Sequence, residues 1–471
     1  MSTANQFVNM SVPDGLGVAL TLASTESGLN GSHGDSNDFP QQSGGSGVAE
    51  RAAKPSPKPA FRAVPAVRIA VIDIGSNAIR LVIADCQFSE FEPAPPADPC
   101  GIRGALVESA PHTTDLYEPE PLSERAAETG ARATKPAAEK SVRQVRRVMY
   151  SVIAEQRAAT QLATGLDSTG KLDAKAMEQS AAAIRDMVNI ATDLGVPVSK
   201  IRAMATCAVR EAANRKEFLA LVRRWSGLKV KTISAKREAK FAFSSAKASF
   251  ELSTLHADGS AIIDVGGGST EVILTGRKRK AGRIKRIFLL PVGSVRVTER
   301  FGGPDVAATD RYDELLVFAR KTAKHTIWEL DRRPGVLIGI GGTIAALARL
   351  LLDAGRGTAH GLGETNAHAP LPGGLTDPVQ GMKITQDDVQ SALLALRTLD
   401  SSTRRDVPGM TRDRADTIIG GLVIVLAVME RLGNPTLIVH VGGIRDGILR
   451  RSARKELAIA MMAEGNPAPK P

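Results

Sequence analysis

The sequence predicts an α/β fold built from two similar halves. From residue 67 onward, short apolar runs rich in Ile and Val alternate with longer stretches of helical periodicity. One unit also occurs twice: an apolar strand that carries an Asp near its end, a turn of small residues, and a second apolar strand. Gly75-Ser76-Asn77 forms the first turn and Gly266-Gly267-Gly268-Ser269-Thr270 the second. The repeat indicates two domains that open in the same way.

The first half is expected at residues 66–257. Its repeated unit, residues 67–85, has the pattern of a hairpin of buried strands. The remaining pattern predicts strands at 147–162, 201–206 and 230–233, and helices at 173–194, 211–225 and 235–250. The helix at 173–194 should stop at Gly195 and Pro197, because neither residue continues a helix well.

The second half is expected at residues 258–455 and restarts the pattern. Strands are predicted at 260–265, 271–274, 286–290, 335–340 and 437–441, and helices at 310–330, after Gly341-Gly342-Thr343 to 353, and at 386–398, 413–432 and from 444 onward. Residues 361–381 are expected to be a loop. The last helix is expected to pack back onto the first half.

Three segments are expected to lack regular structure. Residues 1–65 are rich in Gly, Ser, Asn and Pro and low in large apolar residues, which predicts a disordered tail. Repeated prolines predict a long irregular insertion at about 87–144. Residues 456–471 are expected to be a flexible C-terminal tail.

Composition narrows the classes of function. Lys and Arg number 61 against 50 Asp and Glu, which gives a formal charge of +11. Residues 1–65 carry four basic and five acidic side chains, so the rest of the chain carries +12. This charge favours an anionic partner: nucleic acid, an acidic membrane surface or a phosphate-rich small molecule.

The cysteines and the apolar runs point to a cytoplasmic protein. The three cysteines lie far apart without a CxxC pair, which argues against a disulfide framework and a zinc site. The first fifty residues contain no Lys or Arg, so the n-region of a secretory signal is missing. The longest apolar run, residues 418–429, is shorter than the roughly 18 to 20 residues that span a bilayer.

The two glycine turns suit a phosphate ligand. Backbone N–H groups without Cβ obstruction can converge on one anion, and the Ser, Thr and Asn side chains add hydrogen bonds. Asp73 and Asp264 precede the turns and would repel phosphate unless a cation lay between the carboxylate and the phosphate, so a bound Mg²⁺ ion is implied. An ordinary hairpin turn explains either unit alone, whereas two units in register favour the phosphate site.

Other candidate residues have two interpretations each. Glu271 begins the strand after the second turn, and is either a site carboxylate or an exposed one. Glu238 lies among Lys and Arg on a helix, where an exposed ion pair is the alternative to a catalytic role. The basic run between residues 277 and 286 is either a solvated hairpin tip or a patch that guides a polyanion. Cys207 has no nearby His and is expected to be a buried small residue.

Five motifs resemble the exopolyphosphatase / guanosine pentaphosphate phosphohydrolase (Ppx/GppA phosphatase) family. They occur in the family's order over about residues 67–86 and 145–452: Val71-Ile72-Asp73-Ile74-Gly75-Ser76-Asn77 with Arg80-Leu81-Val82, Gly165-Leu166-Asp167-Ser168-Thr169-Gly170-Lys171-Leu172, Ala205-Thr206-Cys207-Ala208-Val209-Arg210-Glu211-Ala212, Ile263-Asp264-Val265-Gly266-Gly267-Gly268-Ser269-Thr270-Glu271 and Val441-Gly442-Gly443-Ile444-Arg445-Asp446-Gly447-Ile448. The chain is similar to the short, two-domain form of the family.

The resemblance implies the actin, sugar-kinase and heat-shock ATPase fold, in which two ribonuclease-H-like domains face a central cleft with both glycine turns on its floor. It also implies site roles. Glu238 is the base that activates water, with Glu271 as a second catalytic carboxylate. The residues implied around the metal are Asp73, Asp264 and Glu271, and those implied to bind phosphate are Gly75, Ser76, Asn77, Arg210, Gly266, Gly267, Gly268, Ser269 and Thr270.

One departure from the family pattern affects the base. The family has acidic residues before this Glu, whereas this chain has Ala235-Lys236-Arg237-Glu238. The cations are expected to lower the pKa of Glu238. Residues 1–65 and 87–144 match nothing in the family, so their roles stay open.

The leading hypothesis is a Mg²⁺-dependent exopolyphosphatase that releases terminal phosphate from inorganic polyphosphate. The alternatives are hydrolysis of guanosine pentaphosphate in the same cleft, and a catalytically silent sensor of polyphosphate or of the nucleotide. A sugar or acetate kinase fits less well, because the glycine turns alone provide no adenosine pocket. Polyphosphate carries no bases, which suits a basic chain with 4% aromatic residues and disfavours nucleic acid. The family resemblance also allows a homodimer.

Overall fold

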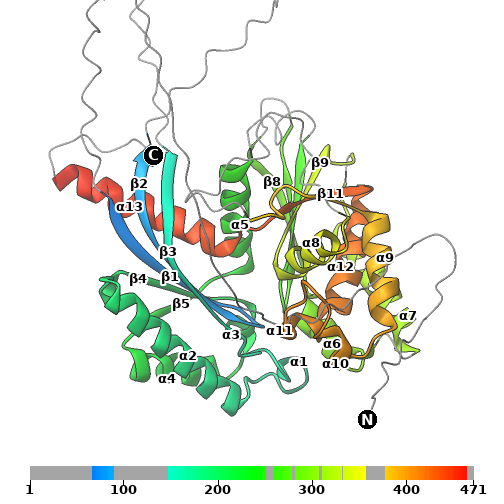
Figure 1. The fold of residues 1–471 in the computed structure, drawn as a ribbon, viewed down its shortest axis with the longest axis horizontal. Helices are drawn as coiled ribbons and strands as arrows, with labels where there is room; N and C mark the ends of the chain where they lie inside the picture. The colour runs from blue at the N-terminus through cyan, green and yellow to red at the C-terminus, as the bar shows by residue number, and fades with distance from the viewer. Residues whose placement is uncertain are drawn as a thin grey trace, which may run out of the picture.

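Two β-sheets, each covered by helices, form the framework of the protein (Figure 1). The computed structural model describes residues 66–89, 147–250, 259–277, 282–306, 310–330, 332–356 and 377–463. The predictions for residues 1–65, for 90–144 within the insertion, for 361–376 and for 464–471 lie outside these residues. No helix in the described ranges is both long and apolar enough to cross a membrane.

The first half holds one sheet with its helices. Its elements in chain order are β1 (Val67–Ile74), β2 (Ile79–Ser89), β3 (Arg147–Ala158), α1 (Leu166–Thr169), α2 (Ala174–Asp193), the 3-10 turn η1 (Val198–Lys200), β4 (Ile201–Ala205), α3 (Cys207–Glu211), α4 (Arg215–Ser226), β5 (Val230–Thr232) and α5 (Ala235–Ser249). The predicted hairpin at 67–85 is confirmed, with Asp73 directly opposite Arg80 across the β1–β2 pair.

The second half repeats this plan. Its elements are β6 (Ser260–Val265), β7 (Thr270–Thr275), β8 (Ile284–Leu290), α6 (Ser294–Arg300), α7 (Arg311–Thr326), β9 (Val336–Ile340), α8 (Gly342–Asp353), β10 (Lys383–Thr385), α9 (Gln386–Arg397), α10 (Ser401–Arg404), α11 (Arg412–Ala415), α12 (Ile418–Leu432), β11 (Thr436–His440) and α13 (Ile444–Ala463). Here Asp264 lies directly opposite Glu271 across the β6–β7 pair.

The two sheets have the same topology. The first has the order β3-β2-β1-β4-β5, and the second has the order β8-β7-β6-β9-β11 with β10 added at its edge. In each sheet the first strand pairs antiparallel with the second and parallel with the fourth. The predicted fold class is therefore confirmed: a mixed α/β chain of two related domains, as in the actin-like ATPase fold.

The largest core surrounds helix α12 in the second half. Nearly every residue of this helix is buried, including Gly420 and Gly421, where neighbouring side chains pack against the helix backbone. The first half has its own core between the sheet and helices α2 and α4, with Phe218 and Ile184 fully buried. Each half therefore has a hydrophobic core of its own.

The two halves exchange a helix. Helix α5 precedes the predicted boundary at 257, yet its residues Ala239, Ala242 and Ala246 pack on Ile262 and Ile338 of the second sheet. Helix α13 packs in return on the first sheet, as predicted for the last helix. Figure 1 shows α13 crossing the face of β1, β2 and β3. The halves are thus interlocked rather than simply joined in sequence.

Several element boundaries differ from the prediction. The helix expected at 211–225 begins only at Arg215, as α4, and Glu211 ends the separate short helix α3; between them the Asn214 side chain is bonded to both backbone groups of Leu172. The helix expected at 413–432 is divided into α11 and α12. Helix α13 continues to Ala463, past the predicted start of the tail at 456, because Leu457 and Met461 bury against the first sheet. Helices α1, α6 and α10 and strand β10 were not predicted.

Candidate active site

The two glycine turns have the same local structure. The N–H of Gly75 donates to the carbonyl of Ala78 over 3.2 Å, and the N–H of Gly266 donates to the carbonyl of Ser269 over 3.0 Å. Each bond closes the hairpin between two buried strands. The two turns therefore repeat each other in backbone geometry as well as in sequence.

The turns also meet at the junction of the halves. A Cβ on Gly267 would lie 2.9 Å from the Cβ of Ser76, and a Cβ on Gly268 would lie 2.7 Å from the Sγ of Cys207. Both distances are shorter than side chains tolerate, so only glycine permits this approach. A small cavity between the halves is lined by residues of both turns, together with Cys207 and Arg296. The structure therefore brings the two predicted phosphate turns together.

The candidate carboxylates gather beside these turns. Asp73 lies at the end of β1, Asp264 near the end of β6, Glu271 at the start of β7 and Glu238 in the first turn of α5. Glu238 is 3% exposed and Glu271 is 2% exposed, so neither is a surface carboxylate. Their charges act on one another, since Asp73 and Asp264 both raise the pKa of Glu238. Four acidic side chains thus share one buried region.

Burial dominates the protonation of this cluster. It raises the pKa of Asp264 to about 6, with a contribution from the charge of Asp73. It raises the pKa of Glu271 well above the usual range, and the charges of Glu238 and Asp264 add to that effect. Burial also raises the pKa of Asp73 against the opposing charges of two arginines. A buried carboxylate ionises with difficulty unless a cation joins it.

Glu238 forms an ion pair with Arg210. The Arg210 guanidinium donates to Glu238 Oε1 and also to the carbonyl of Ile233 over 3.1 Å. The pair attaches the end of α3 to the start of α5 within the first half. In this arrangement, the predicted phosphate-binding arginine contacts the predicted base.

The expectation of a lowered Glu238 pKa is wrong. Burial, with the charges of Asp73 and Asp264, raises the pKa of Glu238 to about 7 despite Arg210. The helix explains the error, because Glu238 faces inward while Lys236 and Lys240 are exposed on other faces. Lys236 and Lys240 are therefore close to Glu238 in sequence, but their charges lie on other faces of the helix.

Sequence reasoning missed a group of arginines on the other side of Asp73. Arg80 faces Asp73 across the hairpin, Arg445 begins α13, and Arg414 lies buried in α11. Burial and the charge of Arg80 lower the pKa of Arg414 to about 10. The repeat contained a signal for Arg80, since it stands seven residues after Asp73 as Glu271 stands seven after Asp264.

The remaining candidates are Cys207 and the basic run between residues 277 and 286. Cys207 is 3% exposed, and burial with the charge of Glu211 raises its pKa to about 12, so the expectation of a buried small residue is confirmed. The hairpin between β7 and β8 closes with a bond from Gly276 N–H to the Arg283 carbonyl over 2.8 Å. Residues 278–281 of the basic run lie outside the described residues, and its role in guiding a polyanion stays a prediction.

Asp73 and Asp264 are the carboxylates available to a Mg²⁺ ion at the turns. Asp73 Oδ1 is buried and has no hydrogen-bond partner in the described structure. Among the described residues no group of three or more Asp, Glu, His or Cys side chains is arranged so that it could hold a metal ion by itself. Mg²⁺ is commonly held by one or two carboxylates, with water and substrate phosphate completing its coordination. Asp73 and Asp264 offer such carboxylates beside the turns.

Paired glycine turns and buried carboxylates thus lie where the two halves of a protein of the actin-like ATPase fold meet. A sequence profile described as the Ppx/GppA phosphatase family matches residues 141–456. The chain belongs to the Ppx/GppA phosphatase family, whose members are hydrolases that act on phosphoanhydrides.

Solved structures support the fold. A Ppx/GppA family member from Aquifex aeolicus is similar with 24% identity and a TM-score of 0.53, over 83% of this chain and 99% of that one. An exopolyphosphatase from Cytophaga hutchinsonii has 19% identity and a TM-score of 0.54, over 86% and 100% of the two chains. A protein described as exopolyphosphatase-like has 21% identity and a TM-score of 0.60, over 83% and 99%.

Proposed function

We propose that this protein is a Mg²⁺-dependent exopolyphosphatase, which releases the terminal phosphate of inorganic polyphosphate. The observation that carries the proposal is Glu238, a buried carboxylate beside two paired glycine turns with a pKa of about 7. A base with a pKa near the working pH is well suited to take a proton from water. The net charge of +11 favours a polyanionic substrate.

Each group of residues at the site has its own role in the proposed hydrolysis. The N–H groups and hydroxyls of the two turns hold the terminal phosphate, and Arg210 meets one of its oxygens. Glu238 orients a water molecule and accepts its proton as the water oxygen bonds to phosphorus. The bond from phosphorus to the bridging oxygen then breaks, and the shortened chain leaves with the bridging oxygen. Mg²⁺ held by Asp73 and Asp264, with Glu271 nearby, would neutralise charge on the phosphates.

Replacement of the base tests this proposal. We expect Glu238→Gln to lower kcat for phosphate release from long-chain polyphosphate by about 10²- to 10⁴-fold, the usual contribution of a general base. KM should change little. Glu217→Gln is the matched control, since Glu217 is an exposed glutamate in the first turn of another helix. Unchanged turnover in the Glu238 variant would refute the assigned base.

Guanosine pentaphosphate is the second candidate substrate, because the family description covers such enzymes and both substrates end in a phosphoanhydride. The two are separated by comparing kcat/KM for long-chain polyphosphate and for the nucleotide. A strong preference for the nucleotide would reverse the order proposed here.

A further inference from the structure

We propose that Arg404, which lies outside the active site, is a positioning residue for the first phosphate turn. It fixes the short helix α11, and α11 in turn holds Asn77. The inference rests on the proposed function only in that Asn77 is taken to bind substrate phosphate.

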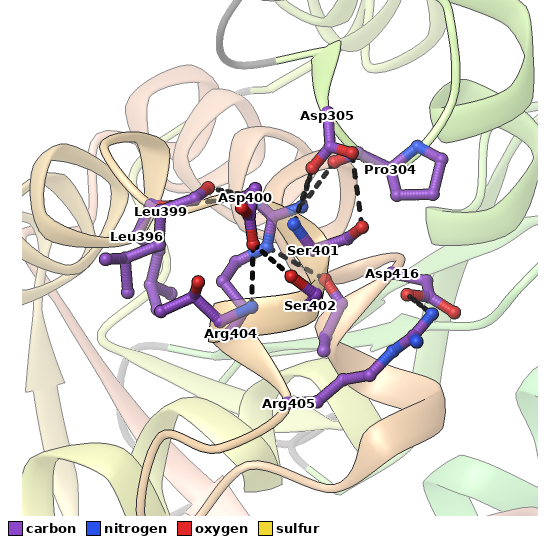
Figure 2. A network of polar contacts seen from close by, with 12 residues as sticks. Pro304, Asp305, Leu396, Leu399, Asp400, Ser401, Ser402, Arg404, Arg405 and Asp416 are labelled. Carbon is purple, nitrogen blue, oxygen red and sulfur yellow. Dashed lines mark hydrogen bonds and ion pairs between the residues drawn. The ribbon is translucent and has the colours of Figure 1, made fainter.

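Arg404 is a fully buried arginine with a complete set of partners. Its side chain is 0% exposed. The Nε donates to the Ala415 carbonyl over 3.1 Å, and Nη1 donates to the carbonyls of Leu399 and Leu396 over 2.8 and 3.4 Å. Nη2 donates to the Pro304 carbonyl over 2.5 Å and to Asp305 Oδ1 over 3.1 Å. Figure 2 shows Arg404 among Leu396, Leu399, Pro304 and Asp305.

These partners join three separate segments of the second half. Leu396 lies in the last turn of α9 and Leu399 just after it, Pro304 and Asp305 follow α6, and Ala415 ends α11. A planar guanidinium can satisfy carbonyls from several directions at fixed angles, which an ammonium group cannot do. Arg404 therefore fixes α11 relative to both anchoring segments.

Helix α11 carries the contact to the other half. Asp413 Oδ2 accepts a hydrogen bond from Asn77 Nδ2 over 2.8 Å and also pairs with Arg157. Asp413 is 8% exposed and Asn77 is 4% exposed, so this bridge between the halves is shielded from water. Through α11, the position of Arg404 determines where Asn77 sits in its turn.

The first test compares two adjacent arginines. We expect Arg404→Lys to raise KM for polyphosphate about tenfold, which corresponds to losing one hydrogen bond to a charged group. The effect on kcat should be smaller. Arg405→Lys is the control, because Arg405 is exposed and lysine can keep its ion pair with Asp416, the residue that caps α11, over 2.9 Å. Its KM should equal that of the wild type.

The second test asks whether Arg404 acts through Asp413. In an Asp413→Ala background the bridge to Asn77 is already absent, so Arg404→Lys should no longer change KM. If the two substitutions multiply each other's effects, the proposal is wrong. If Arg404→Lys does not fold, Asp305→Asn takes its place in the same comparison with Asp413→Ala. Asp305 is a half-exposed partner of Arg404, so its replacement is the milder change.

A third measurement is independent of substrate. Amide hydrogen exchange should become faster at both 75–80 and 410–417 in Arg404→Lys, and at neither in Arg405→Lys. Faster exchange at 410–417 alone, with an unchanged KM, would make Arg404 a core residue only. If the wild type hydrolyses neither substrate, the proposed function fails, and the exchange at 75–80 still decides the role of Arg404.

Discussion

The ion pair of Glu238 with Arg210 shows how burial determines the chemistry of a single residue. On a surface such a pair would leave the carboxylate ionised across the neutral range. Here burial and two acidic neighbours oppose the arginine, and the pKa of Glu238 rises to about 7. The same carboxylate is therefore able to hold or release a proton at neutral pH.

The rate should follow the ionisation of Glu238. A base acts only when deprotonated, so kcat/KM should fall about tenfold for each pH unit below about 7. An ordinary Glu would retain activity down to much lower pH. Because Arg210 lowers this pKa, Arg210→Ala should move the acid limb of the profile to higher pH. A profile that stays flat between about pH 5 and 7 would show that the pKa of the base is not raised.

Mg²⁺ should stabilise the folded protein more at high pH than at low pH. The folded protein binds protons at Asp73, Asp264 and Glu271 more tightly than the unfolded chain, because their folded-state pKa values are raised. Stability from this source falls as the pH rises; for Asp264 the fall lies between 3.8 and about 6. A cation that pairs with the ionised groups offsets the loss.

The corresponding measurement is the Tm with and without Mg²⁺ at about pH 5 and about pH 8. The increase in Tm on adding Mg²⁺ should be larger at the higher pH. It should be smaller in Asp73→Asn than in the wild type. Asp186→Asn is the control, because Asp186 is exposed on α2. An equal increase at both pH values in all three proteins would show that these carboxylates do not hold the ion.

At the scale of elements, helix α5 carries Glu238 but is fastened to the opposite half. Ser245 on α5 lies 2.8 Å from His440 Nε2 at the end of β11, and Gln380 lies 3.3 Å from the other ring nitrogen. Burial lowers the pKa of His440 to about 4, so the ring is neutral in this contact at physiological pH. The helix that carries the base is therefore held by a buried polar contact two turns further along the chain from Glu238.

Two serines of α5 allow a matched comparison. Ser245→Ala leaves buried His440 without this partner and should lower the free energy of unfolding by about 1–3 kcal/mol. Ser249 Oγ is also buried but has no partner in the described structure. Ser249→Ala should therefore change stability by less than about 0.5 kcal/mol. Denaturant unfolding measures both, and equal losses would show that the contact to His440 adds no stability.

Local patterns predicted most elements but not the environment of the site. The strands and helix α2 follow from apolar periodicity and from the cap at Asp173, whose side chain accepts from Ala176 N–H. The raised pKa of Glu238 could not be predicted, since it depends on Asp73 and Asp264 from distant parts of the chain. Arg404 was missed because a short helix such as α10 has no periodic signal, and Arg414 because a helical pattern does not show which side chains meet distant segments.

At the scale of the whole molecule, the active site depends on close contact between the two halves. Arg296 of α6 pairs with Asp167 over 3.1 Å and with Glu211, and the Gly165 N–H donates to Glu299 over 3.1 Å. These contacts join the halves on the side where the turns meet. The site is complete only when both halves are in this arrangement.

A methyl group at the junction should disturb this arrangement. In Gly268→Ala the new Cβ would lie 2.7 Å from Cys207 Sγ and 3.1 Å from Ser76 Oγ, so the second turn must shift away from the first half. We expect phosphate release to fall about a hundredfold, as for misplacement of reacting groups by about 1 Å. Gly443→Ala is the control, because its Cβ would meet Ile340 at an ordinary 3.4 Å. Similar rates for the two variants would contradict the importance of close contact.

The return of helix α13 to the first sheet has a consequence for synthesis on the ribosome. Arg450 donates to the Val148 carbonyl across 302 positions of sequence, and Ile448 and Leu449 cover apolar residues of β1 to β3. Until α13 leaves the ribosome, this face of the first sheet stays open to water or to other nascent chains. The half that is translated first is therefore the half that finishes folding last, and it would depend most on chaperones during translation.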